Sequence, residues 1–178
     1  TGALTIRIYG LSSAYAYQTA DVTLTGQTAV SVATEFLHIY GAEVLTAGSG
    51  GSNAGTIYVA DDSVTWSVGV PSALTATYAQ IPIGANHSQN GWFMVPASQT
   101  YRLRKAWFTN STQSVGAALY VREGASGLVA QYGNWGFAAG YSSQPFYFDD
   151  NEVVLPEKSL LEFRAQAAVS GAVTSVTA

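Results

Sequence analysis

The sequence predicts an all-β protein of the jelly-roll or β-sandwich type, in which residues 1–60 form either a small N-terminal β unit or the first strands of the sandwich. Apolar residues alternate with polar ones at period two, which is the spacing of a strand with one buried face. Glycine, serine, asparagine and proline separate these runs at short intervals, and helical periodicity is almost absent. Roughly a dozen short strands with turns between them are typical of a sandwich or jelly roll.

Three strands are expected in the first 50 residues. In the first of them, one side chain of every two is apolar and should face the core: Leu4, Ile6 and Ile8 alternate with Thr5, Arg7 and Tyr9. A second strand centres on Val22 and Leu24. Residues 34–46 have apolar side chains at both odd and even positions, which predicts a longer central strand with a bend near Gly41.

A glycine- and serine-rich turn region follows at residues 48–55, where glycine reaches left-handed backbone angles at low cost. A strand is expected at 56–60. Residues 61–74, which contain Gly69 and Pro71, are predicted to form a junction. The chain would then consist of residues 1–60, this junction, and a jelly-roll-like sandwich over residues 75–178.

The sandwich should contain the remaining strands, at residues 75–83, 92–95, 101–109, 117–122, 128–132, 146–148, 160–168 and 172–177. The strand at 117–122 has the clearest alternation. Its residues Ala117, Leu119 and Val121 should face one way, and Ala118, Tyr120 and Arg122 the other.

Charge and composition restrict the function. Only 10% of the residues are charged, against about 25% in an average soluble protein. The surface is therefore uncharged and polar, or is covered by a partner, as in an assembly subunit or a protease-resistant extracellular module. The net charge of −4 argues against nucleic-acid binding, and no apolar run is long enough to cross a membrane. With no cysteine, the chain has neither disulfides nor a thiolate site.

No catalytic constellation is recognisable. The chain has two histidines, His38 in a strand and His87 in a polar stretch, and neither has a neighbouring nucleophile or metal ligand at a useful spacing. The glycine-rich region lacks the Gly-Lys-Ser/Thr ending of a phosphate-binding loop, and no nucleophile elbow is present. We therefore expect no enzymatic activity and no cofactor.

The densest acidic run, Asp149, Asp150 and Glu152, is a calcium candidate because loops of β-sandwiches often supply carboxylate ligands. An acidic loop between two apolar strands is, however, more often a solvated turn. A pair of carboxylates for glycoside hydrolysis is not indicated.

Aromatic residues on glycine-broken or loop-like segments are the best candidates for an interface, since they combine a large apolar area with a polar tip. The alternatives are that they fill the core or stack on sugar rings. The residues selected on this basis are Tyr15, Tyr17, Tyr132, Trp135 and Tyr141.

Three segments together resemble a group of virion proteins from tailed bacteriophages, notably marine and cyanobacterial ones. They are AGTIYV at residues 54–59, VPASQTYRLRKAWFTNS at 95–111 and VVLPEKSLLEFRA at 153–165. The proteins of this group are described as head-decoration, cement or other particle-surface proteins with jelly-roll folds. The resemblance implies a structural role, no catalytic residues, and assembly in symmetric copies, with a trimer favoured.

The sequence thus leads to two hypotheses. In the first, the chain is a non-enzymatic virion-surface protein that stabilises the particle by contacts with its own copies and with other virion proteins such as the major capsid protein. In the alternative, it is a carbohydrate-binding β-sandwich, lectin-like or part of a phage receptor-binding element. That protein would stack sugars on Trp135 and Tyr141 and could use calcium at residues 149–152.

Overall fold

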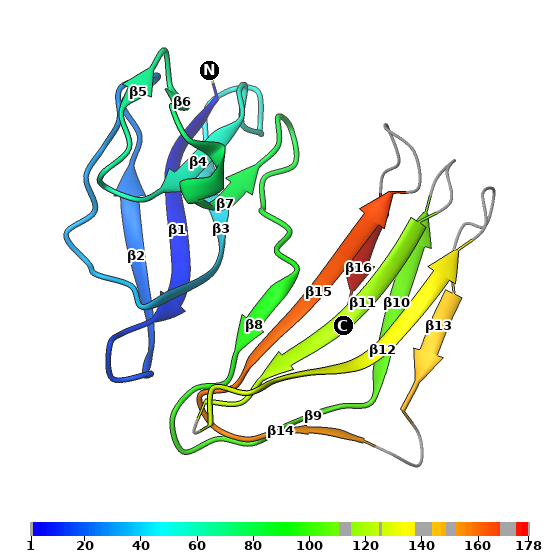
Figure 1. Ribbon diagram of the computed structural model, residues 1–178. Coiled ribbons are helices and arrows are strands. Elements are labelled where there is room, and N and C mark those ends of the chain that lie inside the picture. Colours follow the sequence, from blue (N-terminus) through cyan, green and yellow to red (C-terminus); the bar gives the residue numbers. More distant parts are fainter. Residues whose placement is uncertain are drawn as a thin grey trace. The chain divides into compact units, whose positions relative to one another are not determined.

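The computed structural model describes residues 2–110, 115–124, 126–137, 144–148, 152–167 and 174–177 (Figure 1). Every regular element in these ranges is a β-strand except one short 3₁₀ turn, η1 (Leu74–Ala76). All strand pairs are antiparallel. The prediction of an all-β fold is confirmed. In this part of the chain no helix is both long enough and apolar enough to span a membrane.

The chain divides into two compact units, residues 1–90 and 91–178. The predicted junction at 61–74 was wrong, because the strands on either side of it pair with each other: β4 (Ile57–Ala60) lies antiparallel to β7 (Thr77–Ile81). The segment between them is an excursion of the first unit that contains the short hairpin β5 (Trp66–Ser67) and β6 (Val70–Pro71), followed by η1. The boundary therefore comes after β7, not before it.

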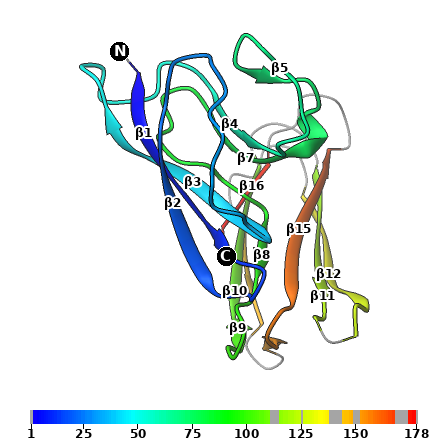
Figure 2. The ribbon, with the colours of Figure 1, turned by 90° about the vertical axis from the view of Figure 1, so that its left-hand side faces the viewer.

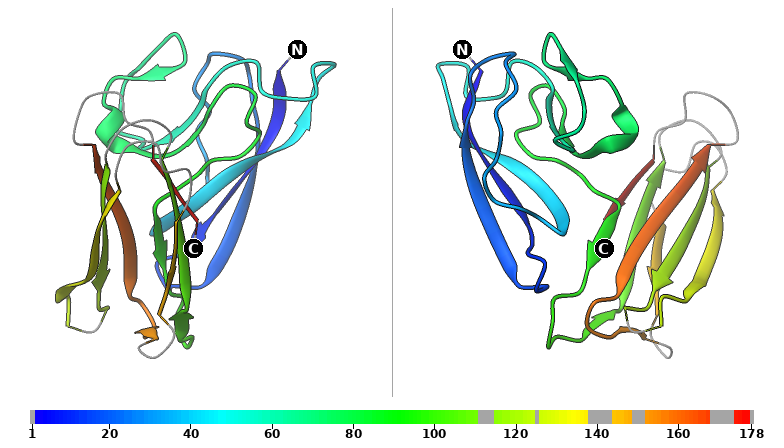
Figure 3. Two further views of the ribbon diagram at one scale, coloured as in Figure 1. Left: turned by 90° about the vertical axis from the view of Figure 1, so that its right-hand side faces the viewer. Right: turned by 60° about the vertical axis from the view of Figure 1, so that its left-hand side comes forward.

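The first unit contains a three-stranded sheet in the order β2-β1-β3, whose strands lie side by side in Figure 3. Its members are β1 (Ala3–Leu11), β2 (Tyr17–Thr23) and β3 (His38–Ala47). The expected alternation is present from Thr5 to Tyr9, since Ile6 and Ile8 are buried while Thr5, Arg7 and Tyr9 are partly exposed. Leu4, which was also expected to face the core, is 48% exposed. The apolar cluster of this unit joins the inner side of the sheet to β7 through Ala79 and Ile81.

The central strand begins later than predicted, at His38 instead of residue 34. Residues 34–37 approach the end of β1 without entering a strand, and Leu37 N–H donates a hydrogen bond to the Leu11 carbonyl oxygen. Within the strand, the register against β1 shifts between Gly41 and Ile39, beside the glycine where a bend was expected. This shift decides which side chains of β3 face outward.

The glycine-rich region 48–55 is fixed by one buried side chain, that of Asn53, which is 2% exposed. Its Nδ2 donates to the carbonyl oxygens of Gly55 (2.9 Å) and Pro82 (2.7 Å). Its Oδ1 accepts from Asn86 N–H at 3.1 Å, and its own N–H donates to Asn86 Oδ1 at 3.2 Å. Two loops distant in sequence are thereby joined by a reciprocal pair of asparagines.

Residues 86–88, continuing from this pair, cover the outer edge of β3. Val44 N–H donates to the Asn86 carbonyl oxygen at 2.7 Å, and Ser88 N–H donates to that of Ala42 at 2.8 Å. Ser88 Oγ also accepts from Ala42 N–H. A Cβ atom at Gly41 would come within 2.6 Å of Ser88 Oγ, which explains the glycine at this position.

The second unit is built from two layers, which Figure 2 shows with β11, β12 and β15 in one and β10 in the other. One sheet has the order β12-β11-β15-β8, and the other strands form β13-β10-β16 and β14-β9. The strands are β8 (Trp92–Met94), β9 (Tyr101–Leu103), β10 (Lys105–Asn110), β11 (Val115–Arg122), β12 (Val129–Phe137), β13 (Gln144–Tyr147), β14 (Val153–Leu155), β15 (Leu160–Ala167) and β16 (Thr174–Thr177).

Four of the six strand pairs that the structure describes in the second unit are nested, and β11–β15 and β10–β16 are the other two. The hairpin β11–β12 is innermost, β9 and β10 pair with β14 and β13 around it, and β8 pairs with β15 outside them. Leu119 and Leu161 from one layer meet Leu103 and Val153 from the other in a single apolar cluster, as in a β-sandwich. In β11 the predicted alternation is confirmed, with Ala117, Leu119 and Val121 at most 1% exposed.

A candidate interaction face on the first sheet

Of the five aromatic residues selected from the sequence, the structure places one on an open aromatic face. Tyr17 begins β2 and is 59% exposed. Tyr15 lies in the β1–β2 turn with a φ of 59°. Tyr132, 45% exposed, is in β12 of the second unit. Of Trp135 the structure describes only the backbone, in β12, and Tyr141 lies outside the described residues.

Tyr17 is the middle ring of three on the outward side of the β2-β1-β3 sheet. Its centroid is 6.5 Å from that of Tyr9 and 6.3 Å from that of Tyr40, and both pairs are stacked, with interplanar angles of 29° and 19°. His38 packs edge-on against Tyr40 at 5.2 Å. We call Tyr9, Tyr17, Tyr40 and His38 the tyrosine face. Each strand of the sheet contributes at least one ring to it.

The register shift in β3 creates this face. Ala42 pairs with Ile8 and Gly41 with Tyr9, but the next pair is Ile39 with Gly10, so Tyr40 is an extra residue in β3. An extra residue reverses the inside–outside order of everything before it. Ile39 therefore enters the core, where it is 9% exposed, while Tyr40 and His38 turn outward. Without the shift, the apolar and aromatic side chains would exchange sides.

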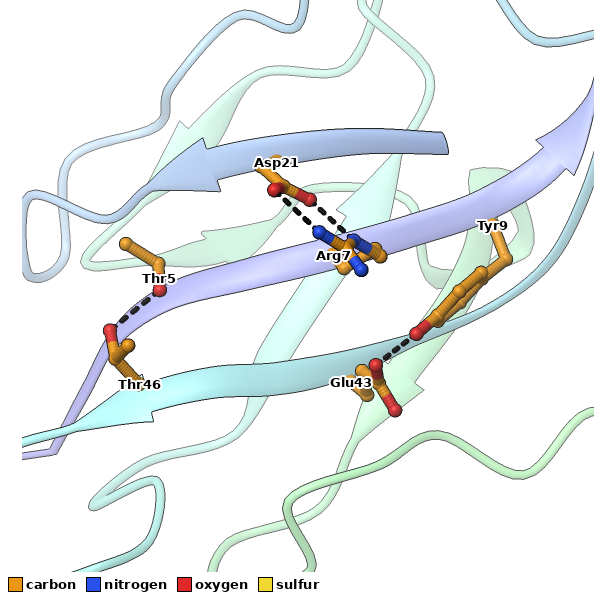
Figure 4. Close-up of polar contacts among 6 residues, drawn as sticks. All are labelled: Thr5, Arg7, Tyr9, Asp21, Glu43 and Thr46. Atoms are coloured by element: carbon orange, nitrogen blue, oxygen red, sulfur yellow. Dashed lines mark hydrogen bonds and ion pairs between the residues drawn. The ribbon is translucent and has the colours of Figure 1, made fainter. Parts of the chain in front are cut away.

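The sheet continues beyond the rings with polar pairs that are already matched (Figure 4). Arg7 and Asp21 form a two-pronged ion pair, with Nε–Oδ1 at 2.7 Å and Nη2–Oδ2 at 2.8 Å. Tyr9 Oη donates to Glu43 Oε1, and this hydrogen bond raises the pKa of the Tyr9 hydroxyl. The hydrogen bond from Arg7 lowers the pKa of Asp21. Arg7 and Asp21 thus neutralise each other, whereas Tyr9 gives Glu43 a hydrogen bond but no opposite charge.

His38 is the titratable member of the tyrosine face whose pKa is shifted most clearly. Burial lowers its pKa from the ordinary value of 6.5 to about 4. Its Nε2 atom is buried and has no hydrogen-bond partner in the part of the chain that the structure describes. The ring is therefore neutral near pH 7 and contributes an uncharged surface beside Tyr40.

This shift predicts that the protein becomes less stable as the pH falls from about 7 to about 4, because the unfolded state takes up a proton at His38 before the folded state does. At about 1.4 kcal/mol per pKa unit the full effect is about 3 kcal/mol, and solvent screening of the partly exposed ring reduces it to about 1–2 kcal/mol. Urea unfolding at both pH values measures it. His38→Gln should show a flatter pH dependence; an equally steep one would contradict the assignment to His38.

The calcium candidate is not supported by its described member. Glu152 Oε2 accepts from Arg102 Nη1 at 2.5 Å, and Glu152 Oε1 lies 2.9 Å from Arg104 Nε. These guanidinium groups lower the pKa of the Glu152 carboxyl and occupy both of its oxygens. Asp149 and Asp150 lie outside the described residues. Among those that are described, no group of three His, Asp or Glu side chains could hold a metal ion.

The sequence predicted Tyr17 but missed Tyr9, Tyr40 and His38 as its partners. The outward position of Tyr9 followed from the alternation of β1 and could have been combined with Tyr17. Tyr40 and His38 depend on the register shift, for which the sequence offered only Gly41 as a signal. Comparison of the chain with protein-family models, with curated proteins and with solved structures found no match.

Proposed function

We propose that this chain is a non-enzymatic structural protein of a virion surface, of the decoration or cement type, which stabilises the particle by contacts with its own copies and with other virion proteins such as the major capsid protein. The observation that carries the proposal is the tyrosine face, an ordered aromatic surface on a sheet in which Tyr17 is exposed and Tyr9, Tyr40 and His38 are partly buried. The low charge of the chain and the two-layered antiparallel β-sandwich of the second unit support it as well.

The chemistry of the face suits a protein partner. Tyrosine offers a large rigid contact area for the cost of ordering only two side-chain torsions, and aromatic anchors supply much of the binding energy of protein interfaces. Arg7 and Asp21 already form an ion pair with each other, so a partner that covers them buries no unpaired charge. Stacking holds the three rings in place before binding, which lowers the entropy lost on association.

Light scattering coupled to size-exclusion chromatography tests the association. The purified chain should elute with a mass that is a multiple of the monomer mass, and the trimer implied by the resemblance is the first multiple to look for. A monomer at every concentration that can be reached would contradict self-association. Mass spectrometry of purified particles tests the location: the chain should be present in them, and its absence would contradict the virion role.

A second candidate function, carbohydrate binding, is favoured by a hollow in the first unit. This hollow has a volume of about 550 Å³, and Trp66, Tyr78, Asp61 and Asp62 are among the residues that line it. Tyr78 Oη donates to Asp61 Oδ2 at 2.8 Å, and hydrogen bonds from Ser63 and Tyr78 lower the pKa of Asp61 to about 2. A hollow lined by aromatic side chains and a few convergent polar groups is typical of sites for small molecules such as sugars.

A glycan array read with and without a calcium chelator tests this candidate. Sugar binding that is lost in Trp66→Ala but kept in Trp92→Ala, a tryptophan of the second unit, would establish the hollow as the site. If the wild-type chain binds no glycan on the array, carbohydrate binding is excluded and assembly remains the sole proposal.

A further inference from the structure

The two edges of the β2-β1-β3 sheet differ in how far their backbone hydrogen-bonding groups are covered. The edge of β3 is covered by residues 86–88 through backbone hydrogen bonds. On the other side, β2 pairs with β1, and no strand among the described residues pairs with its outer edge. The loop after β2 returns to it at Gln18, where the side-chain Nε2 donates to the Glu35 carbonyl oxygen at 2.6 Å. That contact uses a side chain of β2 and not its backbone.

The β2 edge also lacks the features with which proteins protect a free strand. Such strands are normally very short, or they carry lysine, proline or a bulge. β2 has seven residues, YQTADVT, with neither lysine nor proline. Its register against β1 runs without a shift from Tyr17 to Thr23. Its one charged residue, Asp21, is neutralised by Arg7. A long regular edge of this kind is suited to receive another strand.

We propose that β2 pairs with β2 of a second copy, antiparallel about a two-fold axis at Ala20, so that the two three-stranded sheets become one continuous sheet. This inference rests on the proposed function and names one surface through which copies associate, a dimer contact in addition to the tyrosine face and to the trimer that the resemblance implies. Around that axis Ala20 faces its own counterpart, Thr19 faces Asp21 of the second copy, and Tyr17 faces Thr23 of the second copy. A two-fold contact requires such self-complementarity.

The side chains of β2 agree with this register. On the outward side, the Thr19 hydroxyl can donate to the opposite Asp21 carboxylate, and the two Asp21 residues do not face each other. The small Ala20 at the axis permits close approach. The tyrosine faces of the two copies become parts of one surface, which enlarges the area available to a further partner.

A single cysteine tests the register, because the chain has none of its own. Directly opposite residues of an antiparallel pair have Cβ atoms about 4.5–5.5 Å apart, close to the separation in a disulfide. Ala20→Cys should therefore give a disulfide-linked dimer after oxidation by dissolved oxygen, visible on a non-reducing gel. Ser72→Cys, on an exposed loop of the same unit, should not.

A charge pair gives a second test that needs no covalent bond. Thr19→Asp places a like charge opposite Asp21 twice in each dimer and should weaken self-association roughly tenfold. Thr19→Lys places an opposite charge there and should leave the dissociation constant unchanged or lower it. Equal effects of the two variants would overturn the register.

The outcomes separate this inference from the proposed function. If the chain associates but Ala20→Cys forms no more disulfide-linked dimer than Ser72→Cys does, pairing of β2 is excluded while assembly through another surface stands. If wild-type chain is monomeric in light scattering and neither cysteine variant is linked, both pairing of β2 and self-association as a whole are excluded, and mass spectrometry of particles decides the virion role separately.

Discussion

Replacement of Asn53 by alanine should lower the free energy of unfolding by about 2–4 kcal/mol, because it leaves buried hydrogen-bonding groups without partners. The Asn53 side chain donates to two carbonyl oxygens and accepts from the N–H of Asn86. Alanine removes these bonds, together with a longer one from Nδ2 to the Ile81 carbonyl oxygen at 3.4 Å, at a site that is 2% exposed. Asn86 belongs to residues 86–88, which cover the outer edge of β3, so the destabilisation should extend to that edge. Urea unfolding measures the change.

Asn90→Ala is the matched control. Asn90 donates one hydrogen bond, from Nδ2 to the Tyr78 carbonyl oxygen at 3.2 Å in an exposed setting, and its loss should cost less than about 1 kcal/mol. Hydrogen exchange should show faster exchange at Val44 and Ser88 in Asn53→Ala but not in Asn90→Ala. Equal destabilisation by the two substitutions would contradict the role given to Asn53.

Replacement of Tyr17 by serine should weaken association with the protein that covers the tyrosine face by at least about 2 kcal/mol, or roughly 30-fold. The substitution removes the middle ring of the stack and leaves Tyr9 and Tyr40 without their common neighbour. Because Tyr17 is 59% exposed, the stability of the monomer should change by less than about 1 kcal/mol. Sedimentation velocity over a range of concentrations measures the dissociation constant.

The second unit offers a closely matched control for this variant. Tyr147 is 58% exposed and lies in β13, under the ammonium group of Lys105. Tyr147→Ser removes the same atoms from a surface of equal exposure that is not part of the tyrosine face. It should leave association unchanged. Loss of association in both variants, or in neither, would contradict the assignment of the interface to this face.

The sequence predicted well those features that depend on neighbouring residues. Alternation in β1 and β11 identified the buried side of each strand, because a strand reverses its side chains at every residue. Tyr17 was found from its neighbours as well, as an aromatic residue in a loop-like stretch of alanine and serine. The all-β class followed from many such local patterns together.

The features that were missed depend on partners far along the chain. Asn53 resembled any turn residue in a glycine-rich segment. Its burial and its hydrogen bonds come from residues 82–86, which pack against it in the folded chain. Residues 61–74 resembled a linker because they contain Gly69 and Pro71. Only the pairing of β4 with β7, on either side of them, shows that they belong to the first unit. Glu152 resembled a calcium ligand until Arg102, 50 positions earlier, was placed beside it. In each case the deciding contact is set by tertiary structure.

The central claim is that protein, and not solvent or a small ligand, covers the tyrosine face when the chain does its work. An electron-microscopy map of the assembled chain, alone or on its particle, tests this most directly. The account predicts density of a neighbouring chain against Tyr9, Tyr17 and Tyr40. A map in which all neighbours contact other surfaces and these three rings stand open to solvent would contradict it.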